Sequence, residues 1–217
     1  MLPRLVAIFA HPDDESFGPS GTLALMAKTH EIHLICATKG GAGQNSLNTN
    51  EPLTEVRSRE LQRSATIIGI HHVHFLNYED GTLSNNLYHA IAKDIQEIID
   101  PLQPELFLTF EPRGISGHID HITMSMVTSY IFERADYAKE LWYYCTEESR
   151  APTSEYFIYR PPGYPRERID KIHDITTVWD KKIQAMLAHE TQVEDARRII
   201  KHLQPLPKEE FFLVKKK

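Results

Sequence analysis

The sequence predicts an α/β fold, with a mostly parallel sheet flanked by helices. Short apolar runs alternate along the chain with segments whose apolar residues recur at helical spacing. Strand, helix and strand in that order form the unit that makes a right-handed parallel crossover. The chain has 217 residues, of which 41% are hydrophobic, so it can bury one sizeable core. We therefore expect a single domain over residues 1–217.

The first half of the chain alternates clearly. Residues 5–9 form a short apolar run before Pro12, which predicts a buried strand that ends abruptly. Residues 53–69 have apolar side chains at helical spacing, with Thr54 as the expected N-cap and Gly69 as the end. By the same criteria we expect strands over 31–38 and 72–76 and a short helix over 22–27.

The second half repeats this alternation. An amphipathic helix is predicted to reach residue 99, before Pro101, and a strand over 106–110 is followed by Pro112. We also expect strands over 141–145, 156–159 and 169–175, and a terminal strand or docking segment over 211–214. The loop over 114–121 is expected to open a helix that runs to about 134, and two more helices are expected over 177–190 and 193–203. The Pro-rich segment 161–165 is expected to be a connector or the rim of a pocket.

Composition excludes several classes of protein. The formal charge of −6 disfavours a nucleic-acid partner, because such proteins concentrate Lys and Arg. No window approaches the roughly 18 apolar residues of a membrane helix, and the first apolar run is too short for a secretion signal. Cys36 and Cys145 lie in apolar runs, which fits a reducing compartment. We expect a soluble cytoplasmic protein without a membrane partner.

A cluster of metal-binding residue types follows the first predicted strand. His11, Asp13 and Asp14 would lie at the carboxyl edge of the sheet, where open α/β sheets bind their ligands. In a core these side chains would repel and desolvate one another, whereas a divalent cation would hold them together. They therefore predict half of a metal site, although Asp13 could instead cap the next helix.

A second cluster follows the strand over 106–110. His118 and His121 are three residues apart and share a face if a helix begins there, while Asp120 points elsewhere or back toward the loop. The carboxyl ends of two parallel strands can converge, so this loop can supply the other half of the site.

One combination of these residues suits a catalytic metal. His11, Asp14 and His121 provide two imidazoles and one carboxylate, a set that suits zinc and permits other first-row divalent ions. Three protein ligands leave a position open for water. Asp13 would remain unligated beside that water.

Other polar residues have simpler structural explanations. Arg57 lies on a helix whose charged residues are typical of an outer face. His72 and His74 share a strand face with no carboxylate nearby in sequence, which favours structural or solvent-facing roles. A capping or packing role is favoured for His189, and Glu15 could support the site or cap a helix.

The two motifs together resemble a known family. Residues 11–15 (HPDDE) with 18–24 (GPSGTLA), followed much later by 117–121 (GHIDH), are similar to the LmbE-like, or PIG-L, zinc-dependent N-acetyl-sugar deacetylases. The resemblance covers most of the chain. It implies a single Rossmann-like α/β domain, commonly a homo-oligomer, that acts on a small N-acetylated sugar.

The resemblance also implies roles for individual residues. The metal ligands of the family fall on His11, Asp14 and His121, and its general base falls on Asp13. Its oxyanion-stabilising histidine falls on His118, which Asp120 would keep protonated, while Arg57 and Asp80 become candidates for substrate binding.

The expected reaction is hydrolysis of the N-acetyl amide of an amino sugar. Zinc lowers the pKa of its bound water to about 7, so that Asp13 could accept the proton and pass it to the leaving amine. Two alternatives stay open. A non-haem iron oxygenase could use the same triad, although its usual β-rich scaffold conflicts with the predicted alternation. A metal-stabilised sugar-binding protein without turnover would not need an unligated Asp13.

Overall fold

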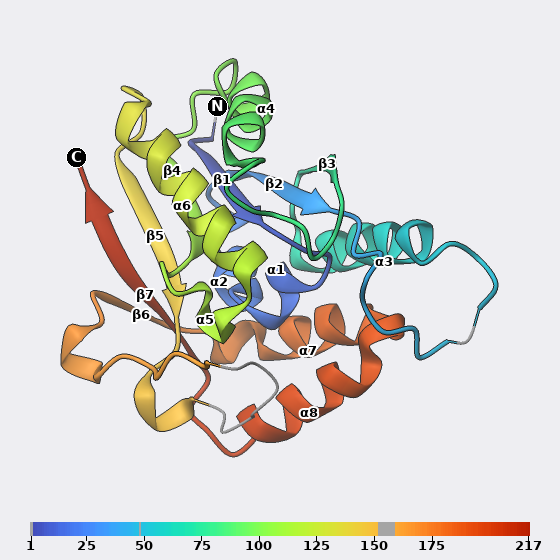
Figure 1. Ribbon diagram of the computed structural model, residues 1–217. Helices are drawn as coiled ribbons and strands as arrows, with labels where there is room; N and C mark the ends of the chain where they lie inside the picture. The colour runs from blue at the N-terminus through green and yellow to red at the C-terminus, as the bar shows by residue number, and fades with distance from the viewer. Residues whose placement is uncertain (1, 48, 152–158) are drawn as a thin grey trace.

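The computed structural model describes residues 2–47, 49–151 and 159–217, and these contain a seven-stranded sheet in the order β3-β2-β1-β4-β5-β7-β6 (Figure 1). The strands are β1 (Arg4–Phe9), β2 (Glu31–Thr38), β3 (His72–Tyr78), β4 (Leu106–Phe110), β5 (Glu140–Cys145), β6 (Lys171–Asp174) and β7 (Glu209–Lys216). Strands β1 to β5 pair in parallel, whereas β7 is antiparallel to both β5 and β6. The predicted α/β fold with a mostly parallel sheet is confirmed.

Helices cover both faces of the sheet. They are α1 (Asp14–Phe17), α2 (Ser20–Met26), α3 (Leu53–Ile68), α4 (Tyr88–Ile99), α5 (Gly114–Gly117), α6 (Ile119–Arg134), α7 (Trp179–Leu187) and α8 (Val193–Leu203). Figure 1 shows α4 and α6 on one side of the sheet and α3 and α7 on the other. Leu5, Ala7 and Phe9 of β1 pack toward α3, while Val6 and Ile8 pack toward α6. Coverage of both faces explains why this strand is an unbroken apolar run.

Several predicted boundaries need correction. Gly69 ends α3 with a φ of 97°, as expected, but the N-cap is Pro52 rather than Thr54. The helix expected over 177–190 stops at Leu187, so His189 lies beyond it. The terminal strand is longer than 211–214, and the strand expected over 156–159 falls mostly outside the described residues.

The topology brings the two sequence motifs to one place. Strands β1 and β4 are direct neighbours, with Leu5 opposite Leu106 and Ala7 opposite Leu108. The chain leaves β1 toward β2 on one side, while β4 lies on the other, so the carboxyl end of β1 is a topological switch point. Among the described residues no helix is long and apolar enough to cross a membrane.

Candidate active site

The three predicted metal ligands converge at the carboxyl ends of β1 and β4. Nδ1 of His11 lies 3.2 Å from Nε2 of His121 and 3.7 Å from Oδ2 of Asp14. Oδ1 of Asp14 lies 3.2 Å from the same His121 nitrogen. Donor atoms around a tetrahedral zinc ion, at Zn–N distances of 2.0–2.1 Å, are about 3.3 Å apart. The spacing and chemistry of these donors therefore fit a zinc-type ion with an open fourth position.

The carboxylate of Asp14 is held by the chain that precedes it. Its Oδ2 accepts hydrogen bonds from the main-chain N–H groups of Ala10, at 3.1 Å, and His11, at 2.8 Å. Burial alone would raise the pKa of Asp14, but the charge and hydrogen bond of His121, with the help of His11, keep it well below its ordinary value. Asp14 is therefore ionised, as a metal ligand must be.

The far nitrogen of His11 lies between two carboxylates. Nε2 is 3.1 Å from Oδ1 of Asp80 and 3.1 Å from Oδ2 of Asp120. Burial opposes charge on the ring, yet the bonds with Asp120 and Asp80 and the charge of Asp14 raise the pKa of His11 to about 10. Nε2–H donates to these carboxylates, so that Nδ1 faces the other two donors and would bind a metal on losing its proton, the usual arrangement for a ligating histidine. Asp80, predicted to bind substrate, contacts the predicted metal ligand His11, and its contact with substrate stays a prediction.

His121 is oriented by a strained loop after β4. Its Nδ1 lies 3.1 Å from the carbonyl oxygen of Gly114, whose φ is 71°. The next residue, Ile115, has a φ of 56°, which is unusual for a β-branched side chain. Glu111 holds this loop by accepting bonds from the N–H of Ile115, at 3.2 Å, and the hydroxyl of Tyr164, at 2.8 Å. Sequence reasoning missed Glu111, although an acid at the end of a buried strand was a visible signal.

His118 differs from the sequence expectation. It is the N-cap of α6, and its Nδ1 accepts a hydrogen bond of 3.1 Å from the main-chain N–H of Asp120. The carboxylate of Asp120 instead bonds to His11 and to the N–H groups of Gly81 and Leu83. Burial and the nearby charges of His121 and His11 lower the pKa of His118 to about 4. His118 is thus a neutral imidazole whose Nε2–H is a donor, rather than an imidazolium kept protonated by Asp120.

Asp13 projects from a strained backbone beside the metal ligands. Its φ is 117°, and its N–H donates to Oε2 of Glu15 at 3.0 Å. Its Oδ2 accepts a hydrogen bond of 2.9 Å from Nη2 of Arg57. Burial and the charge of Asp14 raise the pKa of Asp13 to about 6, against the opposing charge of Arg57. The Asp13 side chain makes no N-cap bond to α1, so the capping alternative is not supported.

Arg57 lies beneath a glycine-rich loop rather than on an outer helix face. It is 3% exposed and donates to the carbonyl oxygens of Gly40, at 2.8 Å, and Pro12. A Cβ atom at either Gly40 or Gly43 would lie 2.4 Å from Nη1 of Arg57, so a side chain at either position would displace the guanidinium. The structure places Arg57 against Asp13 and the main chain, and contact with substrate remains a prediction.

Glu15, which accepts a hydrogen bond from the main-chain N–H of Asp13, is itself held by buried side chains. Oε1 of Glu15 accepts hydrogen bonds from Ser64, at 2.6 Å, and from Nε2 of His189, at 2.8 Å. Burial would lower the pKa of His189, but the charge and hydrogen bond of Glu15 raise it above its ordinary value. His189 is therefore a packed residue in an ion pair. No local pattern could have linked it to Glu15, which is 174 positions away.

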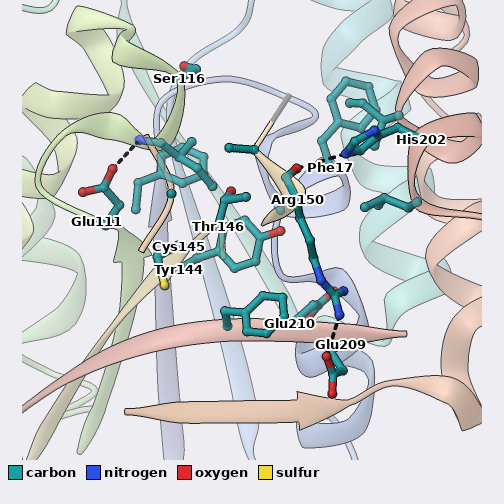
Figure 2. Close-up of a pocket in the computed structure, with 18 of the residues that line it drawn as sticks. Phe17, Glu111, Ser116, Tyr144, Cys145, Thr146, Arg150, His202, Glu209 and Glu210 are labelled. Carbon is teal, nitrogen blue, oxygen red and sulfur yellow. Dashed lines mark hydrogen bonds and ion pairs between the residues drawn. The ribbon is translucent and has the colours of Figure 1, made fainter. Parts of the chain in front are cut away.

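A cavity of about 610 Å³ opens beside the metal ligands, with Asp14 and His121 in its wall. Its size is that of a small-molecule site. Figure 2 shows Tyr144 and Phe17 at the cavity, and Arg150, whose carbonyl oxygen lies 3.0 Å from Nε2 of His202 and whose guanidinium pairs with Glu209. The Pro-rich segment predicted as a connector or rim lines the same cavity through Pro161, Pro162, Gly163 and Tyr164.

Comparison with known proteins finds deacetylases among the relatives of this chain. The chain is 32% identical over 203 residues to a probable N-acetyl-α-D-glucosaminyl L-malate deacetylase 2 of Bacillus subtilis, covering 91% of this chain and 87% of the relative. It is 26% identical over 235 residues to a 1D-myo-inositol 2-acetamido-2-deoxy-α-D-glucopyranoside deacetylase of Mycobacterium sp., covering 90% and 76%.

A solved structure shares the fold. N,N'-diacetylchitobiose deacetylase from Pyrococcus horikoshii superposes with a TM-score of 0.75 at 19% identity, covering 98% of this chain and 84% of that one. Residues 6–132, which include the three predicted metal ligands and Asp13, match the family model described as PIG-L, GlcNAc-PI de-N-acetylase. On these grounds the chain belongs to the PIG-L (LmbE-like) family.

Proposed function

We propose that this protein is a metal-dependent deacetylase that hydrolyses the N-acetyl amide of an amino sugar or its glycoconjugate. The observation that carries the proposal is the partly buried carboxylate of Asp13, which lies beside the three donors His11, Asp14 and His121 without being one of them. A sugar-binding protein would not need a desolvated base at this point. The α/β scaffold and the deacetylase relatives favour amide hydrolysis over an iron oxygenase.

The proposed chemistry divides among a few residues. A first-row divalent ion, preferably zinc, held by His11, Asp14 and His121 would polarise the acetyl carbonyl and lower the pKa of water. Asp13 accepts the proton of the attacking water and later gives it to the departing amine, so that amide and water become amine and acetate. The Nε2–H of His118 donates to the carbonyl oxygen as negative charge develops there.

The cavity suggests the class of substrate. Aromatic side chains at Phe17, Tyr144 and Trp179 provide flat apolar surfaces, while Arg113 and Arg160 provide hydrogen-bond donors. Such a mixture suits a sugar ring that carries a polar substituent. The two curated relatives are named for N-acetylglucosamine joined to malate or inositol. We propose an N-acetylglucosaminide with a small polar aglycone.

Two further expectations belong to the proposal. The chain is expected to act in the cytoplasm, in keeping with its two buried free cysteines. It is also expected to form a homo-oligomer, as is common in the family it resembles. Size-exclusion chromatography with light scattering would test the second expectation, and a mass equal to one 25.0 kDa chain would contradict it.

A panel assay tests the activity. Purified protein of measured metal content would be incubated with N-acetylglucosamine, its disaccharide and its malate and inositol glycosides, and release of primary amine would be followed. Amine release that a chelator abolishes and zinc restores is the expected result. Oxygen consumption with bound iron would support the oxygenase instead, and tight stoichiometric sugar binding without amine would support a binding protein.

A further inference from the structure

A second group of histidines and a carboxylate gathers at the opposite edge of the sheet. Glu31 begins β2 and His72 begins β3, so both lie at the amino ends of parallel strands, far along the sheet from the candidate active site. His33 is paired with His72 across the two strands. Ligand atoms from Glu31, His33 and His72 all lie within 4.8 Å of one another.

The distances within this group resemble those of the first donor set. Oε1 of Glu31 lies 3.3 Å from Nε2 of His72 and 3.6 Å from Nε2 of His33. Donors around a tetrahedral zinc-type ion are about 3.3 Å apart. Arg4 binds the other oxygen of Glu31, with its Nε 3.0 Å from Oε2, and this fixes the carboxylate while leaving Oε1 to face the imidazoles.

His33 supplies the observation that points to a ligand. It is 4% exposed, and its Nε2 is buried without a hydrogen-bond partner in the described part of the chain. Its other nitrogen, Nδ1, lies 3.2 Å from Nε2 of His74. When Nδ1–H donates to His74, the lone pair of His33 Nε2, which lies 3.6 Å from Oε1 of Glu31, has no hydrogen-bond donor among the described residues, and this is costly for a buried polar atom.

We propose that Glu31, His33 and His72 form a second binding site for a first-row divalent cation. Two imidazoles and one carboxylate are a donor set for zinc and its neighbours rather than for magnesium or calcium. His72 has a half-exposed side chain, which gives an ion access from solvent and lets the ring adjust. An ion here would join the edge strand β3 to β2 and stabilise the folded state by binding it alone.

Zinc titration of variants that lack the active-site metal ligands measures binding at the proposed second site alone. Asp14→Ala removes a ligand of the active site, so this protein is expected to bind one equivalent of zinc, where the unaltered chain binds two. Adding His72→Ala or Glu31→Gln should abolish the remaining equivalent and the rise in Tm that zinc produces. Adding His89→Ala, an exposed histidine on α4, is the matched control and should change neither.

His72→Ala alone tests the second site while the active site is intact. His72→Ala in the otherwise unaltered chain should bind one equivalent of zinc and retain amine release, because the active site is at the other edge. His121→Ala serves as a second background should Asp14→Ala fail to fold. The proposal is overturned if the unaltered chain binds a single equivalent, or if His72→Ala still binds two.

Discussion

Replacing Asp13 with asparagine removes one ionisable group and leaves its surroundings almost intact. Asparagine has the same size, and its side-chain oxygen can still accept the hydrogen bond from Arg57. The bond from the residue 13 N–H to Glu15 comes from the main chain and is unaffected. Asp13 is also not one of the three donors, so metal binding should persist.

The environment of Asp13 determines how the Asp13→Asn substitution should change kcat and stability. Removing a general base typically costs a factor of about 10² to 10⁴ in rate, so kcat should fall by that amount while KM changes little.

The pKa of Asp13 is raised from 3.8 to about 6, so the folded state binds the proton more tightly than the unfolded one. Stability of the metal-free protein then falls as pH rises from about 4 to 6, by up to about 3 kcal/mol. Asp13→Asn should avoid this loss and raise Tm in chelator at pH 7.

The assay needs three measurements on one preparation: amine release, metal content by elemental analysis, and Tm in chelator. Asp14→Ala is the matched control, since it alters the adjacent acid and should lose metal and activity together. Full activity of Asp13→Asn would refute its role as base. Loss of metal from Asp13→Asn would place the residue among the ligands and refute the assigned geometry.

Three further substitutions test other parts of the structure. Arg57→Lys loses a charged hydrogen bond to Asp13, which is worth about 1.5–3 kcal/mol. We therefore expect kcat to fall about tenfold to a hundredfold while the metal content stays constant. An unchanged kcat would contradict the role of Arg57 in positioning Asp13. Ile119→Pro places proline at the first position of α6, after a residue with extended backbone, and should raise the free energy of unfolding in urea by about 0.4–1 kcal/mol. Glu210→Gln removes the negative charge that lies 2.8 Å from buried Lys182, so the lysine charge is no longer compensated. The free energy of unfolding should fall by about 3–5 kcal/mol, and a change near zero would show that the ion pair is dispensable.

The sequence alone was sufficient to predict elements whose pattern lies within one segment and contacts that follow from the order of a parallel sheet. The run over residues 5–9 and the helical spacing over 53–69 each appear within one segment, and both became the expected elements. The convergence of His11 and His121 needed one further rule, that the carboxyl ends of neighbouring parallel strands meet.

The surroundings of those ligands could not be predicted in the same way. The contacts that Asp80 and Asp120 make with His11 were not foreseen, and a contact of Asp80 with substrate stays a prediction. Each contact depends on which loop packs against which, and loop packing leaves no periodic signal. His72 was considered to lack a carboxylate partner because none is nearby in sequence, but pairing of β2 with β3 brings Glu31 to 3.3 Å.

The backbone at Asp13 explains how two adjacent acids acquire different roles. A non-glycine residue at a φ of 117° is strained, and such strain costs on the order of 1–3 kcal/mol. Glu15 binds the N–H of Asp13 and Arg57 binds its carboxylate, so contacts on both sides maintain the conformation. The turn at this residue allows Asp14 to start α1 with its carboxylate on the metal donors while Asp13 faces Arg57. The strained φ therefore separates the proposed metal ligand from the proposed base within two consecutive residues.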